Sequence, residues 1–358
     1  PKEKYTLKIE CVNDKGLLIQ VKNKENLDVS EYIIDLKENR IMEKILYAAM
    51  CAILFLCCSS SDESEANSQS PFTLPDKAIV LAEQASKSVV ILDASTYRTV
   101  WSWNPEKAGV PSNCQTWFHN PSEVKPVFNN QYILMTASGG AVALIRIADS
   151  KLMYYAYVGE NPHSAEILPD GNLVAVSSTD GKLRTFMTDT IKGTGKWFAS
   201  YELPSAHNVV WDLQRELLYT TEGIKLCTYK YNFNRKEPRL QDRSVIFELP
   251  NTESCGHDLF PVYNKIDVLW ITTNENVWQY DIKNNKAELI YPLYAVKSVC
   301  NSADGVLMLY PTTEWWSDGL INEKGKKLFN IYGAKIYKGR WVMNNTFSYP
   351  KEHKPKFE

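Results

Sequence analysis

Three of the five histidines in this 358-residue chain occupy one recurring position in a repeated pattern. His163 and His207 each lie ten residues before the second strand-like run of their repeat, and His257 lies twelve residues before the corresponding run. Neutral imidazole nitrogens suit Zn, Mn, Fe or Ni. If the repeats bring the three rings together, they can hold one divalent metal.

Two further repeats place an ionisable residue at the same position, namely Glu123 and Lys297. Glu123 would add an anionic oxygen to the metal site, and Lys297 would act on a substrate as acid, base or carboxylate clamp. We therefore predict a ligand-binding pocket formed by Glu123, His163, His207, His257 and Lys297. The metal ligands would be the three histidines and Glu123, and the catalytic groups would be Lys297 and His207. The alternative is that these polar side chains only keep a channel hydrated.

The repeat is clearest from Asn161 to Thr179, NPHSAEILPDGNLVAVSST, which predicts two strands joined by a Pro-Asp-Gly turn. Corresponding leucines are 44 residues apart in one pair of repeats (Leu173 and Leu217) and 38 apart in another (Leu269 and Leu307). This period is typical of a four-stranded propeller blade, whose innermost strand lines a central channel. Related stretches begin at Pro121, Ala206, Gly256 and Val296.

Counting strand groups predicts an all-β propeller of six four-stranded blades. The first group has only three runs, and the run from Ala334 to Val342 would complete it and close the ring. The alternative is seven blades, with Lys335–Phe347 and a hairpin around Trp117 counted separately. No stretch past residue 70 has a helical apolar period, so helices should be few and short. The later groups centre on Val124, Ile133, Val142 and Met153; Ala165, Val174, Leu183 and Phe198; Val209, Leu218, Leu226 and Val245; Leu259, Val268, Val277 and Leu289; and Val299, Leu307, Leu320 and Leu328.

The chain before the repeats resembles a bacterial lipoprotein signal. Met42 opens a short charged segment, twelve apolar residues follow, and Cys57 and Cys58 precede a Ser- and acid-rich stretch. Twelve residues are too few to span a bilayer. We expect residues 42–58 to be a signal peptide with Cys58 or Cys57 lipidated, residues 59–75 a tether, 76–350 the propeller and 351–358 a tail. Residues 1–41 would then lie upstream of the true start.

Composition restricts the partners. Lys and Arg number 40 against 42 Asp and Glu, which gives no basic surplus for nucleic acid. The run Lys192–Lys196, KGTGK, has two glycines between lysines but lacks phosphate-loop spacing, so we interpret it as a turn. Cys114, Cys227, Cys255 and Cys300 show no zinc-binding spacing and are expected to be single buried thiols.

The motifs HSAEILPDGN, HNVVWD, GHDLFP and VKSV resemble an uncharacterised family of Bacteroidetes lipoproteins with a propeller domain of unknown function. More distantly, the histidine-lined channel is similar to that of propeller polysaccharide lyases such as oligogalacturonate lyase. That resemblance implies a metal that neutralises a uronate carboxylate while a base removes the adjacent proton. It is an analogy of fold only.

Three functions stay open on the sequence. The preferred one is a monomeric, lipid-anchored propeller on the bacterial outer membrane or cell surface, or in the periplasm, that binds a small or glycan-derived ligand at the axial pocket. The second is a metal-dependent polysaccharide lyase or hydrolase using the same pocket. The third is a protein-interaction scaffold. The lipid would be the only contact with the membrane, and whether the protein is an enzyme is left open.

Overall fold

The computed structural model describes residues 6–13, 16–22, 28–35 and 71–355. The chain divides into two units, Pro1–Gln69 and Ser70–Glu358. In the first unit, β1 (Thr6–Asn13), β2 (Gly16–Lys22) and β3 (Asp28–Asp35) form an antiparallel sheet. The predicted signal peptide, with Cys57 and Cys58, lies outside the described residues. Within the described part of the chain, no helix has the length and apolar character needed to cross a membrane.

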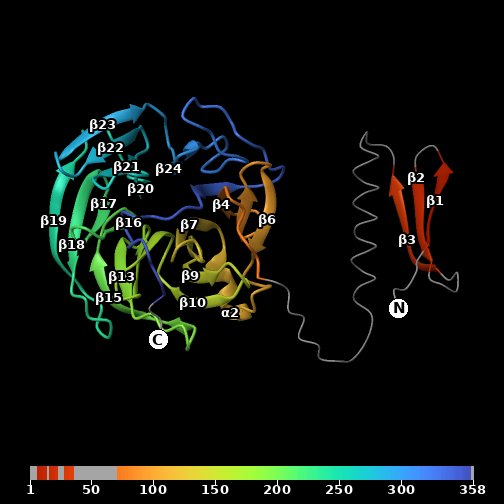
Figure 1. The fold of residues 1–358 in the computed structure, drawn as a ribbon, viewed down its shortest axis with the longest axis horizontal. Helices are drawn as coiled ribbons and strands as arrows, with labels where there is room; N and C mark the ends of the chain where they lie inside the picture. Colours follow the sequence, from red (N-terminus) through yellow and green to blue (C-terminus); the bar gives the residue numbers. More distant parts are fainter. Residues whose placement is uncertain (1–5, 14–15, 23–27, 36–70, 356–358) are drawn as a thin grey trace. The chain divides into compact units, whose positions relative to one another are not determined.

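The second unit is an all-β propeller whose sheets surround a common axis (Figure 1). Most strands are five to seven residues long and run antiparallel to their neighbours. Turns such as Pro169-Asp170-Gly171 join them, and Gly171 has the positive φ of 90° that such a turn requires. Helices are few and short, as predicted: α2 (Ser112–Gln115) and the 3-10 helix η1 (Thr116–Phe118) lie before the second blade.

The propeller has five blades of four or five strands each. The first contains β26 (Ile336–Trp341), β4 (Ala78–Glu83), β5 (Ser88–Asp93) and β6 (Arg98–Trp103). The second contains β7 (Pro121–Val127), β8 (Tyr132–Ala137), β9 (Ala141–Arg146) and β10 (Leu152–Tyr157), with β14 (Thr194–Gly195) added at its edge. The third contains β11 (Pro162–Ile167), β12 (Leu173–Ser177), β13 (Lys182–Phe186) and β15 (Trp197–Glu202). The fourth contains β16 (Ala206–Asp212), β17 (Leu217–Glu222), β18 (Lys225–Tyr231) and β19 (Leu240–Glu248). The fifth contains β20 (Asp258–Pro261), β21 (Val268–Thr272), β22 (Val277–Asp281) and β23 (Lys286–Tyr291).

The prediction of six four-stranded blades was wrong, and so was the alternative of seven. The last predicted group forms only a two-stranded sheet, β24 (Ser298–Ser302) and β25 (Gly305–Leu309). Beyond it the chain makes isolated bridges, such as Met308 with Ile321. The chain folds back closely at Gly319, where an added Cβ would meet the Phe329 carbonyl oxygen. The Trp117 hairpin of the seven-blade alternative is instead the helix η1.

The predicted closure by the end of the chain is confirmed. β26 pairs antiparallel with β4, with Gly339 opposite Leu81 and Arg340 opposite Val80. The first blade therefore joins strands more than 240 residues apart, which removes an exposed sheet edge. Gly339 is needed there, because an added Cβ would lie 2.6 Å from a Leu320 methyl group.

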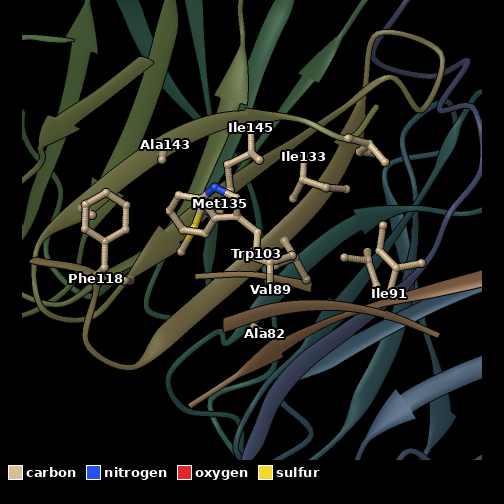
Figure 2. Packing of buried hydrophobic residues seen from close by; sticks show 14 of the residues in the cluster. Ala82, Val89, Ile91, Trp103, Phe118, Ile133, Met135, Ala143 and Ile145 are labelled. Atoms are coloured by element: carbon tan, nitrogen blue, oxygen red, sulfur yellow. The ribbon is translucent and has the colours of Figure 1, made fainter. Parts of the chain in front are cut away.

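Apolar side chains fill the spaces between adjacent blades. Figure 2 shows one such cluster, in which Val89, Ile91 and Trp103 of the first blade face Ile133 and Met135 of the second. The second strands β4 and β8 are buried on both faces, so their sequences are almost continuously apolar rather than alternating. This packing fixes each blade, and hence the residues at the start of each inner strand.

The segment after β26 lies at the end of the ring where the inner strands finish. Leu213, directly after β16, donates its backbone N–H to the Phe347 carbonyl. The Tyr349 hydroxyl hydrogen-bonds Glu166 near the end of β11, and the His353 ring stacks on Phe128 with centroids 4.1 Å apart. The axial channel is thus covered at this end. The candidate site lies at the other end of the channel, where the inner strands begin.

Candidate functional site

A hollow of about 320 Å³, here called the axial cup, opens where the inner strands begin. It brings together side chains from several blades and from the irregular segment after β25. Most carry amide, hydroxyl or basic groups, so the cup is polar in spite of its apolar surroundings. Its lining residues are Gln84, Asn120, Ser138, Asn161, His163, Lys297, Trp315 and Tyr337.

The structure brings the three predicted histidines together beside this cup. The His163 and His207 rings are stacked, with centroids 4.7 Å apart and planes 10° apart. His257 meets His207 edge-on at 5.5 Å, and Tyr337 stacks on the other side of His163 at 5.4 Å. Ring nitrogens bind a metal in the plane of the ring. A parallel stack is therefore a packing arrangement that holds the rings, and it does not aim His163 and His207 at one ion.

All three imidazoles are neutral at pH 7. Burial lowers the pKa of His207 to about 4 and that of His257 to about 3, and burial holds the pKa of His163 well below its usual range. His207 donates from Nδ1 to the Ser205 carbonyl at 2.9 Å, which leaves the lone pair on Nε2. Among the described residues, Nδ1 of His163 and of His257 has no hydrogen-bond partner.

Lys297 reaches the same cluster from the turn before β24. The Lys297 Nζ lies 2.8 Å from His257 Nε2. The same His257 nitrogen lies 2.6 Å from Asn274 Oδ1. Lys297 is only 8% exposed, and no carboxylate among the described residues forms an ion pair with it. Burial lowers the pKa of Lys297 to about 8, so the ammonium form still predominates at pH 7. The cup therefore holds a buried cation without an anion.

Glu123 is not part of the histidine cluster. Its carboxylate pairs with Arg340 (Nη2 to Oε2, 2.9 Å) and with Lys338 (Nζ to Oε2, 3.1 Å), both from β26. The same two cations pair with Asp258 at 2.6 and 3.1 Å. These four side chains are at most 1% exposed. Residues of β7 and β20 are thereby tied to β26, and the four charges form a buried layer across the axis.

One group among the described residues has the spacing of metal ligands, and it differs from the predicted one. Ligand-type atoms of His207, Cys255 and His257 lie within 4.8 Å of one another. The Lys297 ammonium beside His257 opposes a cation there. Burial also raises the pKa of the Cys255 thiol, which disfavours the thiolate form. A bound divalent metal stays a prediction.

Several residues of the cup were missed in the sequence. Trp315 donates from Nε1 to Gln84 Oε1 at 3.0 Å, and Gln84 donates in turn to the Pro121 carbonyl at 3.2 Å. Neither residue lies at the repeated position, so no alignment of repeats could find it. The only sequence signal for Cys255 as a neighbour of the histidines was its position two residues before His257.

The fold and cup define a β-propeller with a polar axial pocket. The chain belongs to a family of unknown function, DUF6528, whose model matches residues 41–357. The predicted resemblance to an uncharacterised propeller family is therefore confirmed in its fold and its lack of assigned activity. The lipoprotein and polysaccharide-lyase parts of that prediction are not confirmed.

Solved structures support the propeller fold. A protein of unknown function from Bacteroides caccae is 11% identical with a TM-score of 0.50, over 74% of this chain and 98% of that one. A nidogen/laminin complex gives 10% identity and a TM-score of 0.51, over 75% and 98%. The periplasmic gluconolactonase of Pseudomonas aeruginosa is also similar, with 13% identity over 74% and 82%, but its TM-score of 0.48 is too low to support the fold. Identities this low indicate fold alone. A comparison with curated proteins found no match.

Proposed function

We propose that the protein binds a small acidic ligand derived from a glycan in the axial cup. The observation that carries this is Lys297, a buried ammonium group without a carboxylate partner among the described residues. An unpaired buried charge is costly, and an anionic ligand would compensate it. In the part of the chain that the structure describes, no carboxylate lines the cup to repel such an anion.

The remaining lining residues suit a sugar. Gln84, Asn120 and Asn161 carry amides that can both donate and accept hydrogen bonds, as sugar hydroxyls require. Trp315 is 47% exposed and held by Gln84, so its ring is available as a stacking surface. A sugar acid would thus place its carboxylate at Lys297 and its hydroxyls against the amides.

The test is calorimetric titration of the whole protein with galacturonate and with galactose as its neutral counterpart. We expect binding of the acid only, and a loss of at least tenfold in Lys297→Gln. Lys225→Gln, which removes a charge outside the cup, should bind like the parent. Equal affinity for galactose, or unchanged affinity in Lys297→Gln, would rule the proposal out.

We also propose that the protein is exported and lipid-anchored, on the sequence signal of residues 42–58. Expression of the full gene in a bacterium with radiolabelled palmitate tests this. The label should be lost when Cys57 and Cys58 are both replaced by Ala. Labelling that persists in the double variant would contradict lipidation at these cysteines.

A further inference from the structure

A second hollow, here called the edge groove, lies between the second and third blades. It has a volume of about 680 Å³ and is lined by three aromatic and two basic side chains together with a short stretch of backbone. The lining residues are Trp117, Tyr157, Lys192, Thr194, Gly195, Lys196 and Trp197. Four of the five KGTGK residues are in this set, Gly193 being the exception. The KGTGK segment takes no part in the axial cup.

Strand pairing holds one wall of the groove in place. The segment between β13 and β15 leaves the third blade and pairs with the second one. β14 runs parallel to β10, with Thr194 opposite Tyr155 and Gly195 opposite Ala156. At Gly195 an added Cβ would lie 2.7 Å from the Tyr154 hydroxyl, so a larger residue would have to displace the buried Tyr154 side chain.

The turn before β14 is also fixed. Asp189 accepts hydrogen bonds from the backbone N–H groups of Ile191 and Lys192, each at 3.0 Å. Gly193 donates to the Asp189 carbonyl and has a φ of 74°, which suits glycine. The two lysines of KGTGK are therefore attached to a backbone that is held at both ends.

The aromatic side chains leave large surfaces in water. Tyr157 is 41% exposed and Trp197 is 48% exposed, and Trp117 is half-buried. Trp117 and Tyr157 have centroids 5.3 Å apart with planes inclined at 60°, so the two rings pack against each other in the wall of the groove. The Arg184 guanidinium lies 5.7 Å from the Trp197 ring centroid and supports it. Exposed aromatic groups gathered in one groove indicate a binding surface.

We propose that the edge groove binds a chain of an acidic polysaccharide. Aromatic rings provide stacking faces for successive sugars, and Lys192 and Lys196 attract the carboxylates of the polymer. Among the described residues, no acidic side chain lines the groove. A nucleic-acid strand is the weaker fit, because it carries a charge on every nucleotide whereas the groove offers two lysines and the chain has a formal net charge of −2. The inference does not depend on the axial cup.

The experiment uses the full chain and affinity electrophoresis in gels containing polygalacturonate, its fully methyl-esterified form, or no polymer. We expect retardation by the acidic polymer and little by the ester. Trp197→Ala should weaken binding at least tenfold, and the double variant Lys192→Ser, Lys196→Ser should abolish the preference for the acid. Near-ultraviolet circular dichroism and the melting temperature show whether each variant is folded.

Matched controls are available on the opposite part of the ring. Tyr332→Ala removes an aromatic side chain that is fully exposed, and Lys283→Ser with Lys286→Ser removes two exposed lysines. Both should bind like the parent. Groove variants that bind as well as these controls would overturn the proposal, as would tighter binding of single-stranded DNA than of polygalacturonate. Titration with monomeric galacturonate reports on the cup and electrophoresis in the polymer reports on the groove, so failure here is distinguishable from failure of the cup.

Discussion

Arg340 Nη2 lies 2.9 Å from Glu123 Oε2, although 217 residues separate the two in the chain. Arg340 is in the strand that closes the ring, and Glu123 is in the inner strand of the second blade. Together with Lys338 and Asp258 they place two cations against two anions on the axis. The layer lies next to the axial cup, since Lys338 also approaches the His163 carbonyl at 3.4 Å.

Removal of Arg340 should destabilise the propeller strongly. Arg340→Met leaves Glu123 and Asp258 buried with one cation between them, and breaking a buried ion pair in this way costs about 3–5 kcal/mol. Urea denaturation measures the loss. Arg146→Met, which breaks a partly exposed pair with Asp149, should cost at most about 1 kcal/mol. A loss in Arg340→Met no larger than in this control would contradict the assigned role.

The buried layer of charges also predicts how the free energy of unfolding falls at acidic pH. Burial alone would raise the pKa of Glu123, but the charges of Arg340 and Lys338 outweigh burial and hold this pKa below its ordinary value. The unfolded chain then binds more protons, so the stability due to Glu123 is present above about pH 4.3 and is lost as the pH falls through the folded-state pKa.

Unfolding free energies at pH 6 and pH 3 measure this effect. The decrease between the two should be smaller in Glu123→Gln than in the parent, since that variant has no carboxyl to protonate there. Glu288→Gln, at an exposed position, should show the parental decrease. If Glu123→Gln loses as much stability as the parent between these pH values, the carboxylate is not held ionised by its neighbours.

The segment after β26 should contribute through Tyr349. Its hydroxyl hydrogen-bonds Glu166, and both side chains are buried. Tyr349→Phe leaves that carboxylate with the 3.4 Å contact to Lys125 and the 3.1 Å hydrogen bond from the Ile167 N–H, and should cost about 1–3 kcal/mol in urea denaturation. Tyr332→Phe, at a fully exposed site, should be neutral. Equal stability of the two variants would show that the segment after β26 covers the channel without stabilising the propeller through Tyr349.

Gly319 should be intolerant of any side chain. An alanine Cβ would lie 1.9 Å from the Phe329 carbonyl oxygen, and backbone cannot move aside as a flexible side chain can. Forcing the two segments apart should cost about 1–3 kcal/mol or more. The melting temperature of Gly319→Ala tests this, and a value equal to that of the parent would mean that the irregular segment after β25 shifts freely.

The sequence by itself determined the propeller class, the near absence of helices in the described part and the closing strand. These depend on local strand and turn signals and on a repeat period that survives in the chain. The repeat also pointed to His163, His207, His257 and Lys297, because equivalent positions in a ring converge on its axis.

Only the tertiary structure decided the number of blades, since the strand-like runs around Leu320 and Leu328 make isolated bridges and do not extend into the regular strands of a blade. It also separated Glu123 from the histidines. A carboxylate is attracted to the nearest buried cations, and these are Lys338 and Arg340 at the far end of the chain, where no spacing rule could place them. The partners of a buried charge are set by three-dimensional proximity, which the repeat does not encode.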